Sequence, residues 1–205
     1  RLQNLSRKIK GGDKSSLEQD ALLRRALVAL ENGKPARTVA VAPEEMKSWK
    51  MLQLLTAKPV LFVCNVEEES AASGNAQSAK VAKMAAEQGA ACVVISAAIE
   101  EEISQLDDDE REMFLTELGL AEAGLDRLIR AGHDLLQLQT YFTVGPKEAR
   151  AWTIHKGTAA PQAAGVIHGD FERGFIRAET IAYDDYVALK GEHGAKEAGK
   201  MRSEG

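Results

Sequence analysis

The sequence predicts an α/β protein joined to a small α+β domain, and two observations carry this prediction. Continuous apolar runs at 60–64 and 91–95 flank a helix-forming segment at 77–88. A strand, a helix and a strand, with both strands apolar on both faces, are typical of a buried parallel βαβ unit. From Leu138 onward the composition becomes β-rich around a Gly145-Pro146 break, which predicts a hairpin in a separate domain.

The bulk composition is that of an ordinary globular protein. The chain has 205 residues, enough for one large domain or two modest ones, with 44% hydrophobic and 28% charged residues. Its net charge of −5 argues against a general polyanion binder, although local patches matter more. No apolar stretch of about 18 residues and no signal-peptide core occur, so we expect a cytoplasmic protein without membrane contact. The sequence starts without Met and within a helical pattern, so we also expect a fragment.

The cysteines and histidines do not suggest a disulfide framework, a metal site or a catalytic nucleophile. Cys64 and Cys92 both lie inside apolar runs, which favours buried thiols in a reducing compartment. None of the four histidines pairs with a Ser or Cys in a recognisable nucleophile setting. A hydrolase triad is therefore not supported.

The first 57 residues are predicted to form a helical hairpin. Leucines at helical spacing indicate a helix over 1–32, interrupted at Gly11-Gly12 and stopped by the turn at 32–35. Apolar residues every three positions over 46–55 indicate a second helix. Two helices joined by a short Gly/Pro turn favour an antiparallel hairpin. The pattern leaves open whether this pair packs on a globular core or projects as a coiled coil.

Two charged clusters are interpreted as solvated faces. The basic one, with nucleic-acid contact as the alternative, comprises Arg7, Lys8, Lys10 and Lys14. The acidic one spans 97–126, with metal binding as the alternative. Phe114, Leu115 and Leu118 give that acidic segment an amphipathic helix, and a further helix over 125–136 is expected to lead out of the domain.

Residues 138–205 are predicted to fold as a hairpin, a helix begun by Pro161 and a strand in "FIRAETIAY". This domain is locally basic, and the contact candidates for RNA or ribosome are Arg173, Lys196, Lys200 and Arg202. The aromatic residues nearby are Tyr141, Trp152, Phe171 and Phe175. An RNA-facing surface is one interpretation; for Tyr141 and Trp152 we favour a place in the core.

Asn65 is the first candidate for ligand recognition. In open parallel sheets, ligands bind beyond the carboxyl ends of the strands. Asn65 ends one apolar run and Ser96-Ala97 ends the next, so a right-handed crossover brings both loops to one edge of the sheet. An Asn there can donate and accept hydrogen bonds, which suits the edge of a nucleobase. The alternative, a helix cap or turn residue, stays open on pattern alone.

A second motif is interpreted as a false match. The segment 194–201, "GAKEAGKM", nearly matches the phosphate loop GxxxxGK[ST], but Met201 replaces the hydroxyl residue that would hold magnesium. Its place in the small C-terminal domain favours a basic surface loop.

Several stretches together resemble the YchF/Obg-like ATPase family. They are "LLTAKPVLFVCNVEE", "VVISAAIEEEISQLD", "LGLAEAGLDRLIRAGHDLLQLQTYFT" and the C-terminal part from "LQTYFTVGPKEARAW" to "KGEHGAKEAGKMRSEG". The resemblance covers essentially the whole chain. It implies an Obg-type P-loop NTPase with a coiled-coil insertion over 1–57, the C-terminal half of the nucleotide-binding domain over 58–137, and a TGS domain of β-grasp, ubiquitin-like fold over 138–205. It further implies association with ribosomes or RNA. The sequence contains no DNA-specific motif.

The resemblance gives Asn65 a role. Ordinary GTPases carry NKxD at this point, where Asp pairs with guanine; this sequence has NVEE, which resembles the family's NxxE variant. Without the Asp that pairs with guanine, a site discriminates less between GTP and ATP. The family accordingly implies ATP use, often beside GTP. By resemblance Asn65 and the main chain of Val66 contact the base and Ser96-Ala97-Ala98 flanks it, whereas the contribution of Glu68 stays open between base contact and solvent.

The sequence also departs from the family pattern. The phosphate loop, the switch regions and the Mg²⁺ ligands do not occur in it, and the last TGS strand is expected beyond Gly205. Because phosphoryl transfer needs phosphate cradle, metal and positioned water together, we expect this chain alone to be inactive. Two hypotheses follow: the chain belongs to a ribosome-associated nucleotide hydrolase, or it is a non-catalytic module that binds RNA or the ribosome.

Overall fold

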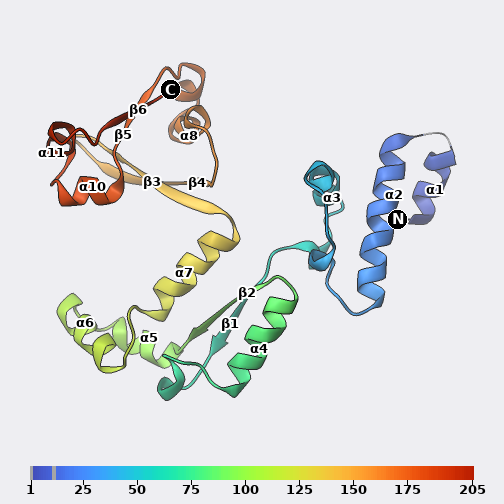
Figure 1. The fold of residues 1–205 in the computed structure, drawn as a ribbon, viewed down its shortest axis with the longest axis horizontal. Helices are drawn as coiled ribbons and strands as arrows, with labels where there is room; N and C mark the ends of the chain where they lie inside the picture. The colour runs from blue at the N-terminus through green and yellow to red at the C-terminus, as the bar shows by residue number, and fades with distance from the viewer. Residues whose placement is uncertain (1, 11–12) are drawn as a thin grey trace. The chain divides into compact units, whose positions relative to one another are not determined.

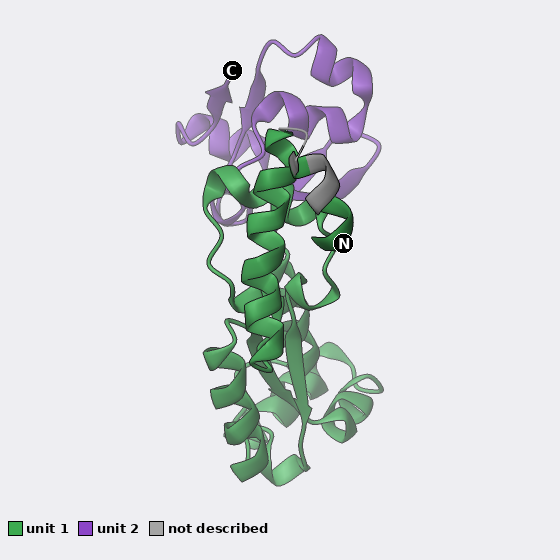
Figure 2. Cartoon of the chain, turned by 90° about the vertical axis from the view of Figure 1, so that its right-hand side faces the viewer, with its two compact units in different colours: residues 1–136 green, residues 137–205 purple. Residues whose placement is uncertain are grey.

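A computed structural model describes residues 2–10 and 13–205, with residues 6–8 and 10 described through their backbone alone. The side chains of three members of the basic cluster, Arg7, Lys8 and Lys10, therefore lie outside the described residues. The chain divides into two compact units, residues 1–136 and 137–205 (Figure 2). In the part that the structure describes, no helix is both long and apolar enough to cross a membrane.

The first unit begins with two helices where one interrupted helix was expected. α1 (Leu2–Lys10) lies beside α2 (Lys14–Glu31) (Figure 1). Asp13 caps α2, since its carboxylate accepts hydrogen bonds from the Ser15 N–H and the Ser16 hydroxyl. α1 and α2 thus lie side by side.

The prediction of a long second helix through Leu55 is wrong. A 3₁₀ turn, η2 (Pro43–Glu45), leads into α3 (Met46–Met51), which has only six residues. Gln53 then takes a left-handed conformation (φ 50°), which ends the helix before another 3₁₀ turn, η3 (Leu55–Ala57). The apolar residues spaced by three belong to a short helix and a turn, and Leu55 is 78% exposed.

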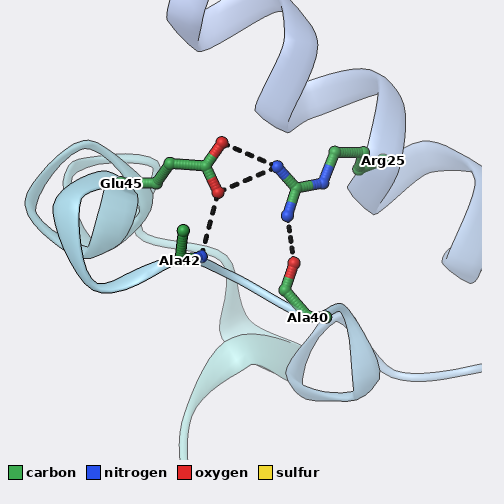
Figure 3. Close-up of polar contacts among 4 residues, drawn as sticks. All are labelled: Arg25, Ala40, Ala42 and Glu45. Carbon is green, nitrogen blue, oxygen red and sulfur yellow. Dashed lines mark hydrogen bonds and ion pairs between the residues drawn. The ribbon is translucent and has the colours of Figure 1, made fainter.

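Arg25 of α2 ties the connecting segment to the helices (Figure 3). Its Nη1 donates to both carboxylate oxygens of Glu45 at 2.8 and 2.9 Å, and its Nη2 donates to the carbonyl of Ala40. The same carboxylate accepts from the Ala42 N–H at 3.0 Å. Beneath this network lies an apolar core of Leu22, Ala26, Ala36, Trp49 and Leu52.

The predicted parallel βαβ unit is confirmed. β1 (Leu61–Asn65) pairs in parallel with β2 (Ala91–Ile95), with Leu61 opposite Ala91 and Asn65 opposite Ile95, and α4 (Ala76–Glu87) connects them. The expected burial of both strand faces is not observed, since Val63 is 44% exposed. In the described residues this sheet has two strands, so its strands gain less cover than those of a wide sheet.

The acidic segment folds into α5 (Ala97–Ile103) and α6 (Asp108–Glu117), followed by α7 (Gly124–Leu135). The predicted amphipathic helix is confirmed, because Phe114, Leu115 and Leu118 pack against a buried apolar cluster. That cluster contains Ala71, Ile99, Ile103, Leu120 and Ala123. α7 and α4 both pack against the β1–β2 pair.

The second unit contains the predicted hairpin and helix. Its elements are β3 (Leu138–Val144), β4 (Ala149–His155), α8 (Ala160–Ile167), α9 (Gly169–Arg173), β5 (Ala178–Thr180), α10 (Tyr183–Ala188), α11 (Glu192–Glu197) and β6 (Arg202–Glu204). β3 and β4 pair antiparallel, as do β5 and β6. The strand expected over "FIRAETIAY" is limited to three residues, and β6 was not predicted.

The first half of the near match to a phosphate loop, residues 194–197, is helical. Gly194 lies inside α11, and a Cβ atom there would come within 2.1 Å of the Leu189 carbonyl oxygen. Gly194 therefore permits a close approach of the backbone to the preceding turn. In a phosphate loop, by contrast, glycine permits a close approach of the backbone to a ligand.

Candidate functional site

The side chain of Asn65 joins the two loops at the carboxyl edge of the β1–β2 pair. Its Oδ1 accepts a hydrogen bond from the Ala97 N–H at 2.9 Å. Ala97 is the first residue of α5, so its N–H is one of the helix-start donors that lack an intrahelical acceptor. Asn65 is exposed and, among the described residues, none accepts from its amide NH₂ group. One end of this side chain is thus structural and the other faces solvent.

Val66 and Ser96 line the same junction from the interior. The Val66 N–H donates to the Ile95 carbonyl at 2.9 Å, which continues the strand pairing past Asn65. Val66 is 8% exposed. Ser96, the residue before α5, is 2% exposed, and in the described part of the chain its Oγ has no hydrogen-bond partner. A buried hydroxyl without a partner is uncommon in folded proteins.

The remaining predicted site residues differ in exposure and role. Ala97 and Ala98 are exposed in the first turn of α5. Glu68 begins a 3₁₀ turn, η4 (Glu68–Ser70), and is exposed. The structure thus places Asn65, Val66 and residues 96–98 around one junction and puts Glu68 in the adjoining turn.

Glu67 has a structural role that the sequence analysis missed. Its carboxylate accepts from the Ser70 hydroxyl at 2.6 Å and from the Asn75 side-chain amide at 3.1 and 3.3 Å. The pKa of Glu67 is lowered, first by the Ser70 hydroxyl and then by its own backbone N–H and Asn75. Asn75 in turn caps α4 by accepting from the N–H groups of Gln77 and Ser78. The spacing of Asn75 and Ser78, typical of a capping box, was the available signal.

Glu100 supports the second loop and was interpreted only as part of a solvated face. Its two carboxylate oxygens accept from the N–H groups of Gly124 and Leu125, at 2.7 and 3.1 Å, at the start of α7. Such a carboxylate satisfies helix-start donors and complements the positive end of the helix dipole. Arg127 adds a hydrogen bond to the Val94 carbonyl of β2 at 3.1 Å. α5, α7 and β2 are therefore held together behind the junction.

The basic candidates of the second unit are exposed, and three of them have acidic neighbours. Arg173 pairs with Asp170, Lys200 with Asp185 at 3.5 Å, and Arg202 with Glu204 at 3.8 Å. Lys196 is exposed on α11. Exposed ion pairs contribute about 0–1 kcal/mol, so these cations remain open to exchange with other anions.

Tyr141 and Trp152, for which a place in the core was favoured, are only half-buried, as is Phe175. Tyr141 donates its hydroxyl to the Ala163 carbonyl at 2.8 Å. Trp152 donates to the Thr143 hydroxyl at 2.9 Å and has the Arg150 guanidinium 4.4 Å from its ring centre. Phe171 is 55% exposed.

The chain is similar to curated bacterial proteins over its entire length. It is 50% identical over 204 residues to "Ribosome-binding ATPase YchF" of Escherichia coli O157:H7, covering 100% of this chain and 56% of that protein. It is also 50% identical over 207 residues to the protein of the same name from Bacillus subtilis (strain 168), covering 57% of it. The chain thus spans a little over half the length of the curated relatives that it matches.

A solved structure and a family model agree with these relatives. The fold matches the "Structure of the Schizosaccharomyces pombe YchF GTPase" with a TM-score of 0.82 and 34% identity, covering 100% of this chain and 56% of that chain. Residues 138–205 match the family model described as YchF-GTPase_C, protein of unknown function (DUF933). The mixed α/β fold with its TGS-like C-terminal domain and the identity along the whole sequence together show that this chain belongs to the YchF family.

Proposed function

We propose that the protein is a ribosome-associated P-loop nucleotide hydrolase that uses ATP, and also GTP, and that this chain carries its base-recognition end. The bacterial relatives are named as ribosome-binding ATPases and the fission yeast structure as a GTPase. We assign residues 1–57 to the helical insertion, 58–137 to the nucleotide-binding domain and 138–205 to the TGS domain.

The proposal rests on the hydrogen bond that the Ala97 N–H donates to the Asn65 side chain. This hydrogen bond orients the Asn65 amide so that the NH₂ group faces outward. Both adenine and guanine present an N7 acceptor, so an amide donor here binds either purine. Asn65 therefore supplies affinity for the base without discriminating between ATP and GTP.

Main-chain groups supply the remaining contacts in this proposal. The Val66 N–H is engaged with Ile95, so Val66 meets the base through its carbonyl, which suits the N6 amino group of adenine. The Ala98 N–H, at the start of α5, suits the O6 acceptor of guanine. One acceptor and one donor at the same edge support use of both nucleotides.

The phosphate end of the reaction is assigned to residues outside this chain. In the described ranges, no group of three or more His, Cys, Asp or Glu side chains is placed to hold a metal ion. We assign the Mg²⁺ ligands of the intact protein to residues outside this chain. The part of this chain's own residues is to bind and orient the base.

Base preference provides the test. In the full-length protein, the double substitution Val66→Lys and Glu68→Asp restores the NKxD pattern of guanine-specific sites. We expect the ratio of ATP to GTP affinity, measured by calorimetry, to shift toward GTP by about tenfold or more. The reason is that an Asp hydrogen-bonded to guanine is left without a partner when adenine is bound. Leu61→Ile, away from the junction in β1, is the control. An unchanged ratio in the double variant contradicts the assignment of this edge to the base.

A non-catalytic module that binds RNA or the ribosome is the second candidate, favoured by the exposed cations of the compact C-terminal unit. Nucleotide turnover separates the two candidates. Hydrolysis of ATP by the purified full-length protein supports the first, whereas ribosome association without any turnover supports the second.

A further inference from the structure

We propose that Cys64 and Cys92 form a dithiol site that hydroperoxides oxidise to an intrachain disulfide between β1 and β2. The two sulfur atoms lie 3.8 Å apart, and both cysteines are free thiols. Neither thiol has a part in the proposed nucleotide site, so this inference goes beyond the proposed function.

The strand register places the two side chains together. Phe62 lies opposite Cys92 and Cys64 lies opposite Val94, in a parallel pair. Because side chains two residues apart on a strand share one face, Cys64 is on the face of Phe62 and hence of Cys92. The cysteines are therefore diagonal neighbours on one face of the pair, which explains the contact between their sulfur atoms.

The remaining movement is short. A disulfide has an S–S length of about 2.05 Å, so the sulfur atoms must approach by somewhat less than 2 Å from their present separation. Rotation about the Cα–Cβ bonds brings the sulfur atoms closer. Because diagonal neighbours stand farther apart than facing residues, the two strands must also shift toward the spacing that a disulfide requires. The hydrogen bonds between β1 and β2 keep the two thiols at this high local concentration.

Exposure and acidity favour a sequential reaction. Both cysteines are half-buried, so a small oxidant can reach them. Burial, and then the neighbouring Cys64 thiol, raises the pKa of Cys92. Since the thiolate is the nucleophile, this direction favours Cys64 as the first thiol to be oxidised and Cys92 as the resolving thiol.

The reaction balances with a hydroperoxide as the two-electron oxidant. The Cys64 thiolate attacks the terminal peroxide oxygen; an S–O bond forms, the O–O bond breaks, and the alcohol or water leaves. Cys92, losing its proton, then attacks the sulfenic sulfur; the S–S bond forms, the S–O bond breaks, and water leaves. A dithiol reductant reverses the oxidation by thiol–disulfide exchange. Transient disulfides of this kind are compatible with a reducing compartment.

The test treats the full-length protein with hydrogen peroxide and maps peptides without reduction. We expect one linked peptide pair, Cys64 with Cys92, with the loss of two hydrogen atoms, and its disappearance after dithiothreitol. In Cys92→Ser, dimedone is expected to trap a sulfenic acid on Cys64. In Cys64→Ser, little adduct is expected on Cys92. Absence of the linked pair overturns the proposal, and equal dimedone labelling of both single variants overturns the order in which the two thiols react.

Phenylarsine oxide tests the juxtaposition of the thiols independently of oxidation. This arsenical binds two close thiols together and resists excess monothiol, whereas binding to one thiol is reversed by it. We expect retention by the wild-type protein at the Cys64 and Cys92 peptides and loss of that retention in either serine variant. Retention at these peptides in a single variant contradicts a shared dithiol site.

Discussion

At the scale of single residues, Asn65 combines two tasks in one side chain. Its oxygen satisfies a helix-start N–H of α5, and its amide nitrogen faces outward at the sheet edge. This division predicts that the two ends can be separated by substitution, because aspartate keeps the acceptor and loses the donor, whereas alanine loses both.

We predict that Asn65→Asp keeps the thermal stability of the full-length protein but weakens ATP binding by about tenfold or more, which corresponds to about 1.4 kcal/mol. Asn65→Ala is expected to weaken ATP binding similarly and, in addition, to lose about 0.5–1.5 kcal/mol of folding stability. Differential scanning calorimetry and nucleotide titration measure the two effects. Equal ATP affinity in Asn65→Asp and wild type would show that the amide donor does not contact the base.

Glu67 makes the stability of the same loop depend on pH. Its pKa is lowered in the folded state, chiefly by the Ser70 hydroxyl, so its contribution to stability is present above the unfolded value of about 4.3 and is lost as the pH falls through the lower folded pKa. We predict that Glu67→Gln lowers the melting temperature at pH 7 and that this difference shrinks at about pH 3.

The matched control is Glu69→Gln, an exposed carboxylate in the same turn. It is expected to change the melting temperature little at either pH, since exposed substitutions away from specific contacts have small effects. A Glu67→Gln difference that stays constant from pH 7 to about pH 3 would contradict a charge-dependent role.

At the scale of elements, α11 depends on a glycine. A methyl group at Gly194 would meet the Leu189 carbonyl oxygen, which is backbone and cannot rotate away. We predict that Gly194→Ala destabilises the second unit by about 1–3 kcal/mol, the usual cost of overpacking. Amide hydrogen exchange in β3 and β4 reports the stability of this unit. Gly169→Ala, where a Cβ meets nothing within 4 Å, is the control and is expected to be near neutral.

The elements were predictable where one periodicity dominated. The βαβ unit, the β3–β4 hairpin and α8 follow from apolar runs, turn residues and an initiating proline, and each is present. The segment after Met51 was not predictable in this way, because a spacing of three suits a helix and a 3₁₀ turn alike. The left-handed Gln53, rather than the apolar spacing, ends α3.

At the scale of the whole molecule, binding to ribosomes is a proposal about the full-length protein. We predict that changing Lys196, Lys200 and Arg202 to Ala weakens cosedimentation with ribosomes and reduces its salt dependence, since each lost phosphate contact lowers the salt slope. Lys34, Lys80 and Lys83, equally exposed in the first unit, form a control triple with the same change of charge. Equal binding by both triples would remove the C-terminal cations from the ribosome contact.

The sequence by itself determined the parallel pairing of two apolar strands, the β3–β4 hairpin and the choice of Asn65 and Ser96 as the residues at the ends of the parallel strands. These features follow from local patterns, because hydrophobic periodicity, turn residues and the right-handed crossover between parallel strands are set over short stretches of chain. Only the tertiary structure decided which side chains contact one another. Asn65 contacts Ala97, Glu67 contacts Asn75, Glu100 contacts Gly124, and Cys64 contacts Cys92. Such pairings depend on which side chains the packed elements bring within hydrogen-bonding or van der Waals distance, and no periodicity in the sequence encodes those distances.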